Sequence, residues 1–285
     1  MKRRTFIKTA AAFAAAPLIP SSLAFAQEKT QWPFFAFDNG VGRGKWTAVK
    51  QAATLKALGY DGISYNYTDN KDLANWTRIY REAGLKIFGL YFPVSPAKDP
   101  PWNPELREAI TVLKGSETVL WITLPAVKTI PSEEYEIAIA KALRSFGDMA
   151  QDAGLKVAIY PHVGFYAATA SDSHRLAERV AHPAVGSSYN LCHEFLAGQG
   201  TTAVDSLRTF GPKASLVSIN GVDTADKKRF ILPLGEGSFD MAAFLAELKR
   251  IGYKGPVGHQ FYSIPGEPED NLMTAITAWR KLQPK

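Results

Sequence analysis

The chain has 285 residues, of which 46% are hydrophobic, 12% aromatic and 21% charged. This balance is typical of a globular protein and excludes a disordered, collagen-like or coiled-coil chain, while the length suits one large α/β barrel. The formal charge is +6, but without the four basic residues of the first 26 positions 29 basic residues face 27 acidic ones, so nucleic-acid binding is not expected.

An export signal is predicted over residues 1–26. Its charged start contains Arg3-Arg4-Thr5-Phe6-Ile7-Lys8, an apolar run continues to Ile19, and Ala24-Phe25-Ala26 has the small-residue pattern of a cleavage site. The paired arginines resemble the twin-arginine signal; an ordinary secretory signal is the alternative. We therefore expect a periplasmic or otherwise exported protein. No later segment reaches ~20 apolar residues, so no stable membrane anchor is expected after processing.

Residues 27–285 are expected to form one domain in which strands and helices alternate. Short apolar or alternating runs predict strands, and runs with helical spacing, most of them followed by glycine, predict helices. In chain order, the predicted strand and helix of each unit are 34–37 and 45–58, 61–65 and 73–83, 85–92 and 104–113, 118–123 and 131–153, 156–160 and 171–180, 185–191 and 202–210, 215–220 and 239–251, and 256–261 and 269–282.

Eight repeated strand–helix units in a chain of this length favour a closed (β/α)8 TIM barrel with parallel strands and right-handed crossovers. A doubly wound open sheet is the alternative. Such a sheet usually has a Gly-rich phosphate-binding turn after its first strand, and the glycines of residues 40–44 lack that spacing. Residues 40–44 are therefore interpreted as a flexible loop between the first strand and helix.

The functional site of a (β/α)8 barrel lies at the carboxyl ends of its strands. The predicted strand ends are rich in Tyr, Asn, Gln and His. This set suits a small-molecule carbohydrate, because amides and phenols hydrogen-bond to hydroxyls and aromatic faces stack on a sugar ring. The residues expected at these ends are Asp38, Asn39, Tyr65, Asn66, Tyr67, Tyr91, Thr123, Tyr160, His162, Asn190, His193, Ser218, Asn220, His259, Gln260 and Tyr262.

Strand parity separates the histidines. Side chains alternate between the two faces of a strand, so His162 points inward if Tyr160 does, whereas His259 points outward if Gln260 points inward. His162 and His193 are therefore the candidate catalytic pair, because neutral imidazoles can act as general base and acid near pH 7 or bind a metal. The alternative for this pair is a hydrogen bond to a neighbouring loop, and for His259 packing is expected.

The remaining candidates each have a structural alternative. Glu236 lies in a Gly-flanked loop expected over the mouth and is either a catalytic carboxylate or a solvated loop acid. Asn220-Gly221 could bind sugar hydroxyls or form a turn. Asp240 begins a helix and is expected to cap it. Cys192, the only cysteine, excludes an internal disulfide and is expected to face away from His193, which argues against a Cys–His nucleophile.

Three stretches resemble the xylose isomerase-like, or sugar phosphate isomerase/epimerase, barrels. Residues 157–162 are similar to the fifth strand of that family and residues 185–193 to its sixth. Residues 233–240, followed by 248–255, look like its penultimate loop and helix. In order and in barrel register, these stretches extend the resemblance over residues 27–285 and imply the same single-domain fold.

The resemblance also implies one divalent cation, held in the family by Glu, Asp, His and Glu from strands five to eight. The corresponding residues here are Tyr160, Asn190, Ser218 or Asn220, and Gln260, while the His that follows the sixth strand remains as His193. Amide oxygens bind a hard cation more weakly than carboxylates do. At most a weakly held manganese, cobalt, magnesium or zinc ion on His193, Asn190 and Gln260 is therefore expected.

Taken together, the mouth residues and the resemblance predict an exported sugar isomerase/epimerase-like enzyme. It would abstract a proton next to the carbonyl of a sugar or keto-sugar, with His162, His193 and Glu236 as catalytic residues. The predicted substrate-binding residues are Tyr160, Asn190, Asn220 and Gln260. A 3-keto-sugar lyase or hydratase and a non-catalytic sugar-binding barrel remain as alternatives. A metal-dependent endonuclease of this fold would need several metal ligands and a basic groove, and neither is evident in the sequence.

Overall fold

The protein was analysed as a computed structural model that describes residues 30–68, 71–130 and 132–284. The predicted signal at residues 1–26 lies outside them. The described strands pair in chain order, each parallel to the next, and the last pairs with the first, so the sheet closes into a barrel. They are β1 (Phe34–Phe37), β2 (Gly62–Asn66), β3 (Lys86–Pro93), β4 (Val119–Thr123), β5 (Lys156–Ile159), β6 (Val185–Asn190), β7 (Ala214–Ile219) and β8 (Val257–His259).

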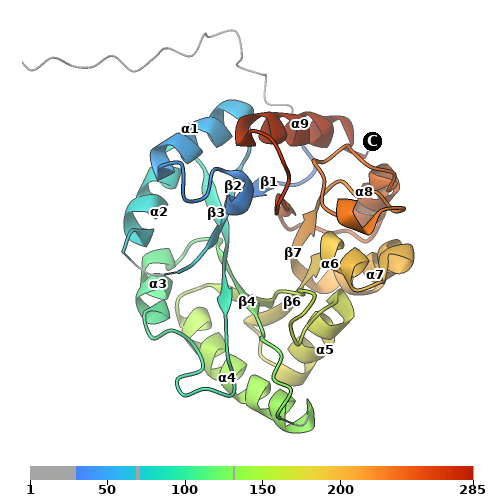
Figure 1. Ribbon diagram of the computed structural model, residues 1–285. Helices are drawn as coiled ribbons and strands as arrows, with labels where there is room; N and C mark the ends of the chain where they lie inside the picture. Colours follow the sequence, from blue (N-terminus) through green and yellow to red (C-terminus); the bar gives the residue numbers. More distant parts are fainter. Residues whose placement is uncertain (1–29, 69–70, 131, 285) are drawn as a thin grey trace, which may run out of the picture.

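Helices form a ring around this barrel, as Figure 1 shows in a view along its axis. The α-helices are α1 (Ala48–Leu58), α2 (Leu73–Glu82), α3 (Leu106–Leu113), α4 (Ser132–Asp152), α5 (Ala170–Val180), α6 (Leu191–Leu196), α7 (Ala203–Phe210), α8 (Met241–Arg250) and α9 (Pro268–Lys281). Short 3-10 turns are η2 (Asp38–Gly40), η3 (Gly200–Thr202), η4 (Gly211–Lys213) and η5 (Lys227–Arg229). The predicted (β/α)8 barrel is confirmed, and the open sheet is excluded.

Local sequence signals fix the helix ends. Thr47 accepts the Lys50 N–H at the start of α1, and Gly59 ends that helix with a left-handed φ of 84°. Thr169 and Asp172 form a reciprocal capping box at the start of α5. Asp240 accepts the Ala243 N–H at 2.9 Å, so its predicted role as the cap of α8 is confirmed.

The main core lies between the strands and the helices. Phe34 on β1 stacks on Trp279 of α9, with ring centroids 4.3 Å apart, and on Tyr60 at 5.4 Å. All three side chains are fully buried, and burying a large apolar side chain contributes about 1.5–3 kcal/mol. This layer fixes the outward faces of the strands and thereby determines which residues point into the barrel.

Aromatic rings fill the barrel interior, and they pack against small residues such as Gly258. A Cβ atom at Gly258 would come within 2.4 Å of the Phe35 ring, so only glycine fits there. Trp121 donates its indole N–H to Ser188 at 2.7 Å and packs on Tyr160, with centroids 4.4 Å apart. These rings close the barrel and leave Tyr160 at the floor of its mouth.

Among the described α-helices, α6 is the one that the sequence did not predict. The sixth strand ends at Asn190, and α6 begins at Leu191, whereas the sequence predicted strand through Leu191. Leu191 and Phe195, four residues apart, lie on one face of α6, and both enter the core. Glu194 fixes the position of α6, because its carboxylate accepts the Ala170 N–H at 2.7 Å and the Ser206 hydroxyl at 2.9 Å. His193 therefore stands on a helix over the mouth.

Among the residues that the structure describes, no helix has the length and hydropathy of a membrane span.

Candidate active site

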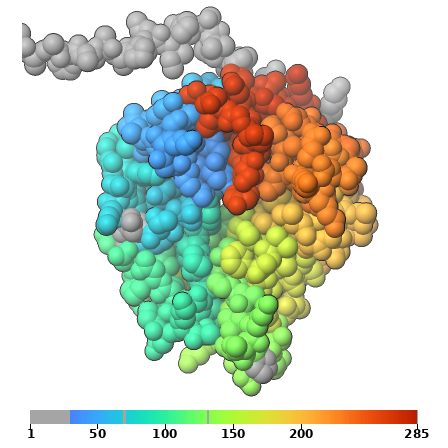
Figure 2. Space-filling model, in the orientation of Figure 1, coloured from blue at the N-terminus to red at the C-terminus, as the bar shows by residue number. Residues whose placement is uncertain are grey.

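A pocket of about 440 Å³ opens at the carboxyl ends of the strands. Its wall is largely aromatic and includes Phe37, Tyr91, Tyr160, Phe165 and Tyr262. Besides the tyrosine hydroxyls, its polar groups are those of Asn39, Arg43, Asn66, Thr123, His162, His193 and Gln260. In Figure 2 the segment after β8 (red) runs beside the segment after β1 (blue), and the Asn39 amide donates to Gln260 Oε1 at 2.6 Å between these two segments.

The pocket brings His162 and His193 together, with ring centroids 4.1 Å apart. His162 lies in a tight turn that the Phe165 N–H closes onto the His162 carbonyl at 3.0 Å. Gly164 is the third residue of this turn and has a φ of 83°, the conformation that a type II turn demands of glycine. The turn brings the Val163 backbone within hydrogen-bond distance of both imidazoles.

Val163 assigns a different tautomer to each ring. The Val163 carbonyl lies 2.8 Å from His162 Nδ1, and since a carbonyl only accepts, Nδ1 carries the proton and Nε2 has the free lone pair. The Val163 N–H donates to His193 Nδ1 at 3.3 Å, so the proton of a neutral His193 is on Nε2. His193 Nε2 is buried and has no hydrogen-bond partner among the described residues.

Burial keeps both rings neutral. It lowers the pKa of His162 below the usual range of histidine. For His193, burial and then the neighbouring His162 lower the pKa to about 3. At neutral pH, His162 Nε2 is therefore a proton acceptor and His193 Nε2–H a hydrogen-bond donor.

Tyr160 is the centre of a hydrogen-bonded group on the pocket floor. Its hydroxyl oxygen accepts the Asn190 amide N–H at 2.7 Å and the Gln260 amide N–H at 3.3 Å. Gln260 is held by the Phe261 and Tyr262 N–H groups, which donate to its Oε1 at 3.0 and 3.2 Å. Burial raises the pKa of Tyr160 well above its ordinary value, so the phenol keeps its proton.

The opposite wall carries an ion pair. Arg43 bonds bidentately to Asp38, with Nε 3.0 Å from Oδ2, and also bonds to the Tyr91 hydroxyl. Tyr91 donates to Asp38 at 2.6 Å, and the Asn66 N–H donates to Asp38 at 3.1 Å. Burial alone would lower the pKa of Arg43, but the hydrogen bond and charge of Asp38 raise it. Arg43 is thus a fixed cation, with a side chain that is 41% exposed.

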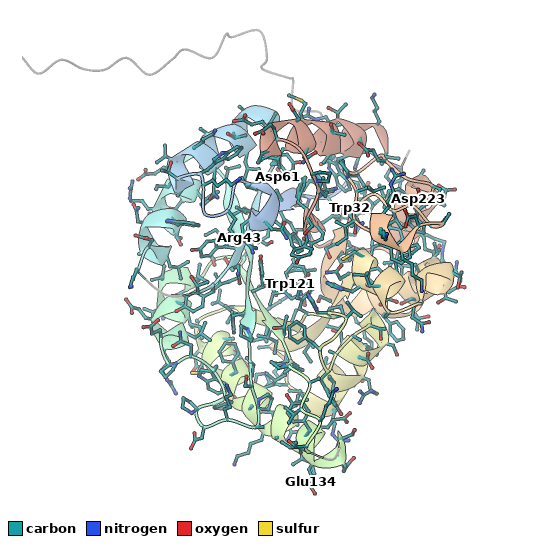
Figure 3. All side chains as sticks on the ribbon, viewed as in Figure 1. Trp32, Arg43, Asp61, Trp121, Glu134 and Asp223 are labelled. Carbon is teal, nitrogen blue, oxygen red and sulfur yellow. The ribbon has the colours of Figure 1, made fainter. Side chains whose placement is uncertain are left out.

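The loop after β1 positions this arginine. Gly42 and Gly44, on either side of Arg43, have φ values of 59° and 73°, in the region that favours glycine. A Cβ atom at Gly42 would also come within 2.4 Å of the Trp46 ring. Figure 3 shows Arg43 and Trp121 inside the ring of helices, whereas Glu134 and Asp223 lie at the periphery.

Not every predicted site residue lines this pocket. Asn220 is fully buried, and its amide donates to the Gly221 and Phe230 carbonyls at 2.6 and 2.7 Å, within its own loop. Glu236 is exposed and lies at a separate hollow beside Leu282, the residue that follows α9.

Two further residues are placed as parity predicts. His259 faces outward and packs on Phe261, with centroids 4.0 Å apart, but neither ring nitrogen has a partner among the described residues. Cys192 is buried, donates to Asn190 at 3.1 Å, and has a pKa raised by burial, so it is a poor nucleophile.

Sequence reasoning missed the cluster formed by Asp38, Arg43 and Tyr91. Asp38 and Tyr91 were placed at strand ends, but Arg43 was interpreted only as part of a flexible loop. An arginine between two glycines, five residues after an acid at a strand end, is the signal that could have indicated it.

The residues at the family's metal positions do not fit a divalent cation. Tyr160, Asn190 and Gln260 carry no charge. Asn190 and Gln260 both donate to the Tyr160 hydroxyl, and the Gln260 oxygen already accepts from three donors. Within the described part of the chain, no three side chains of His, Cys, Asp or Glu are grouped so as to hold an ion. A hard cation needs anionic oxygen ligands, which this group lacks.

Comparison with protein families agrees with this architecture. The family profile of the xylose isomerase-like TIM barrels matches residues 52–282. The chain belongs to this family. A search of curated proteins gave no significant match.

Three solved structures have a similar fold at low sequence identity. A D-allulose 3-epimerase from Methylomonas sp. is 19% identical with a TM-score of 0.73, covering 89% of this chain and 99% of its own. A 3-keto-D-glucoside 4-epimerase from E. coli is 15% identical with a TM-score of 0.69, covering 88% and 99%. A probable 3-DHS dehydratase from Bacillus anthracis is 13% identical with a TM-score of 0.72, covering 87% and 98%.

Proposed function

We propose that this xylose isomerase-like barrel binds a sugar or keto-sugar and catalyses proton transfer at the carbon next to its carbonyl. The observation that carries the proposal is the pair of neutral histidines with opposite tautomers, His162 and His193, which line one pocket with ring centroids 4.1 Å apart. A base and a donor are the two groups that enolisation of a carbonyl compound requires.

His162 is the base in this proposal. Its Nε2 lone pair takes the proton from the carbon next to the carbonyl. The electron pair of the broken C–H bond forms a C=C bond, and the carbonyl π pair moves to oxygen to give an enediolate. The protonated His162 then returns its proton to the adjacent carbon or to the same carbon. The first outcome gives an isomer once the proton of the neighbouring hydroxyl has moved to the former carbonyl oxygen, so that the hydroxyl carbon becomes the new carbonyl. The second restores the substrate when the proton returns to the face it left, and gives the epimer when the enediolate has turned its opposite face to His162.

His193 stabilises the charge that develops on oxygen. Its Nε2–H has no partner among the described residues, so a substrate oxygen would satisfy it. A neutral imidazole suits this role because the pKa of its N–H is close to that of an enediol. The pKa of an imidazolium is further from it. Because the Val163 backbone bonds to both rings, one residue keeps acceptor and donor in their assigned forms.

The other wall suits binding of the hydroxyl groups. Arg43, Asn39 and Asn66 present polar groups from the ends of β1 and β2. In an eight-stranded closed barrel, β1 lies across from β5, so these groups face the histidines from the other side of the mouth. Aromatic rings such as Tyr262, which is 62% exposed at the rim, provide stacking faces for a sugar ring.

The names of the similar structures are consistent with this chemistry. Two are sugar epimerases and one is a probable dehydratase. We keep a 3-keto-sugar lyase or hydratase as the second enzymatic outcome, because an enediolate that expels a hydroxide at the neighbouring carbon eliminates water.

The direct test is exchange of the substrate proton with solvent deuterium. The protein is incubated in D₂O with free hexoses, 2-ketohexoses and 3-ketohexoses, and loss of the proton signal next to the carbonyl is followed by NMR. We expect exchange with at least one class, and a loss of about 10²–10⁴-fold in rate for His162→Gln. His174→Gln, on the outer helix α5, is the matched control and is expected to exchange at the wild-type rate.

The same experiment separates the alternatives. Exchange with a new sugar product supports an isomerase or epimerase, and exchange with an unsaturated product supports a lyase. Sugar binding measured by calorimetry without exchange would contradict the enzymatic proposal and leave a sugar-binding barrel.

We also propose that the protein is exported, on the basis of the signal-like residues 1–26. Expression of the full chain in a Gram-negative bacterium is expected to give a periplasmic protein that begins at Gln27. Replacing Arg3 and Arg4 by lysine is expected to retain it in the cytoplasm. Unchanged export of that variant would indicate an ordinary secretory signal.

A further inference from the structure

We propose that the Tyr160 hydroxyl and the His193 imidazole together form an oxyanion site made only of side-chain donors, which polarises the substrate carbonyl without a bound cation. This inference rests on the proposed function and specifies how its charged intermediate is stabilised. It also assigns a catalytic role to Tyr160 and positioning roles to Asn190 and Gln260.

The hydrogen-bond count at Tyr160 is the first argument. A phenol oxygen donates one hydrogen bond and accepts up to two. The amides of Asn190 and Gln260 use both acceptor positions, at 2.7 and 3.3 Å. The Tyr160 proton has no acceptor among the described residues, although the residue is only 4% exposed and lines the pocket. The group that would accept this proton is therefore a ligand oxygen.

The orientation of the amides is fixed by their surroundings. Gln260 Oε1 accepts two backbone N–H groups and the Asn39 amide, so Nε2 must face Tyr160. Asn190 Oδ1 accepts the Cys192 thiol at 3.1 Å, which leaves its Nδ2 for Tyr160. Each N–H that bonds to the phenol oxygen polarises the O–H bond and makes its proton a better donor.

His193 supplies the second donor of the site. Its ring lies edge-to-face with that of Tyr160, with centroids 5.9 Å apart, and its Nε2–H is also without a described partner. Two unpartnered donors, one directly after β5 and one on α6, thus adjoin one another in a single pocket. Unpartnered buried donors cost free energy, so their pairing in one place indicates that an anionic or strongly polarised oxygen binds there.

The pocket has the electrostatics that such a site needs. Among the described residues that line it, none is acidic, so no carboxylate competes for the two protons. The floor beneath Tyr160 is the Trp121 ring, and preorganised donors in such a water-poor environment act more strongly than in water. The two donors thus stabilise the negative charge on the substrate oxygen, as a cation would otherwise do.

Tyr160→Phe is the first test, with the deuterium exchange rate as the readout. We expect the rate at saturating sugar to fall by about 10²–10³-fold, the loss typical of one oxyanion donor, with KM changed only a few-fold. Tyr60→Phe is the matched control, because Tyr60 is equally buried but bonds to Leu272 between the barrel and α9. An unchanged rate in folded Tyr160→Phe would overturn the proposal.

Replacing the amides of Asn190 and Gln260 by carboxylates distinguishes the donor site from a cation site, because the two accounts predict opposite changes in the exchange rate. In Asn190→Asp and Gln260→Glu, a carboxylate oxygen would accept the Tyr160 proton, so we expect the exchange rate to fall with or without added manganese. The wild-type rate is expected to survive chelation with EDTA followed by dialysis. Wild-type activity that is lost on chelation and returns with manganese, or carboxylate variants that manganese makes faster than wild type, would overturn the proposal.

An infrared measurement separates this inference from the proposed function. The carbonyl stretch of 13C-labelled dihydroxyacetone, bound at saturating concentration, is expected to move to lower frequency in the wild type and to move less in Tyr160→Phe. If the wild type exchanges no proton but shows this difference, the proposed reaction is wrong and the donor site is correct. If the stretch is the same in both proteins, the donor site is wrong, whether or not exchange occurs.

Discussion

The two walls of the pocket use polar groups in opposite ways. On the wall from β1 to β3, Asp38, Arg43 and Tyr91 bond to one another, and the buried carboxylate accepts four hydrogen bonds. On the wall from β5 to β6, Tyr160 and His193 each keep a proton that no described residue accepts. A satisfied network fixes shape, whereas unsatisfied donors are available to a ligand. The satisfied network holds Arg43 in place at the pocket, so we assign binding to the first wall, and we assign proton transfer to the second wall, whose donors are unpartnered.

The largest effect is expected from the histidine wall. His162→Gln should slow exchange by about 10²–10⁴-fold at saturating sugar. Because the two imidazoles act on one intermediate, the double variant with His193→Gln should be little slower than the slower single variant. Exchange rates at saturation for both single variants and the double variant measure this. Losses that multiply in full would show that the two histidines act independently.

A smaller effect, on affinity, is expected from the ion-pair wall. Arg43→Met removes hydrogen bonds from a charged donor, each worth about 1.5–3 kcal/mol, so sugar affinity should weaken by roughly 10–100-fold. The exchange rate at saturation should change only a few-fold. The double variant Asp38→Asn/Arg43→Met removes both charges and serves as the control, because Arg43→Met alone leaves a buried carboxylate without its cation. Equal affinity in both variants and the wild type would contradict the assignment.

The pH dependence of exchange follows from the neutral form of His162. Burial lowers the pKa of His162 below about 6.5, the usual value. The rate should therefore rise about tenfold per pH unit in acid and level off below about pH 6.5. Two-bond ¹H–¹⁵N NMR spectra of the imidazoles report the protonation state of the ring directly. A rate that levels off only above about pH 7 would contradict a buried base.

The smallest effect concerns stability and lies outside the pocket. Burial lowers the pKa of His259 to about 3, whereas the unfolded chain takes up a proton below about pH 6.5. Stability is therefore lost as the pH falls from about 6.5 toward 3, by up to about 1.4 kcal/mol per pH unit for this group.

His259→Leu should remove this part of the acid sensitivity and leave stability near neutral pH equal or higher, because both ring nitrogens lack described partners. Urea unfolding at about pH 7 and about pH 5 measures the difference, with His174→Leu on α5 as the control. The prediction fails if His259→Leu retains the wild-type loss of stability in acid.

Most of the fold could be predicted from local signals in the sequence. The eight strand–helix units follow from hydrophobic periodicity and from helix ends such as Gly59, and the orientation of His259 follows from strand parity. Helix α6 could not be predicted in this way. Its six residues are too few for a clear period, and its position depends on Glu194 bonding to Ala170 and Ser206, which are distant in sequence.

The site could be predicted only where residues follow strands directly. Tyr160, His162 and Gln260 lie at strand ends and line the pocket as expected. Asn220 is held by the Phe230 carbonyl, and its loop folds back through a bridge between Gly221 and Leu232. Such contacts are set by tertiary structure and leave no mark on local sequence patterns.

Loop conformation likewise determines whether Glu236 and Arg43 reach the mouth of the barrel. Glu236 follows the bridged loop away from the mouth, whereas the glycines beside Arg43 turn its side chain into the mouth. The residue types were evident in the sequence, but their directions depend on backbone angles that only the folded loops define.

The most direct test of the two-wall account is to measure sugar affinity and exchange rate side by side in His162→Gln and Arg43→Met. The account predicts that His162→Gln binds the sugar within a few-fold of wild-type affinity but loses exchange, and that Arg43→Met loses affinity but exchanges at nearly the wild-type rate when saturated. Loss of exchange at saturation in Arg43→Met, or full exchange in His162→Gln, would contradict it.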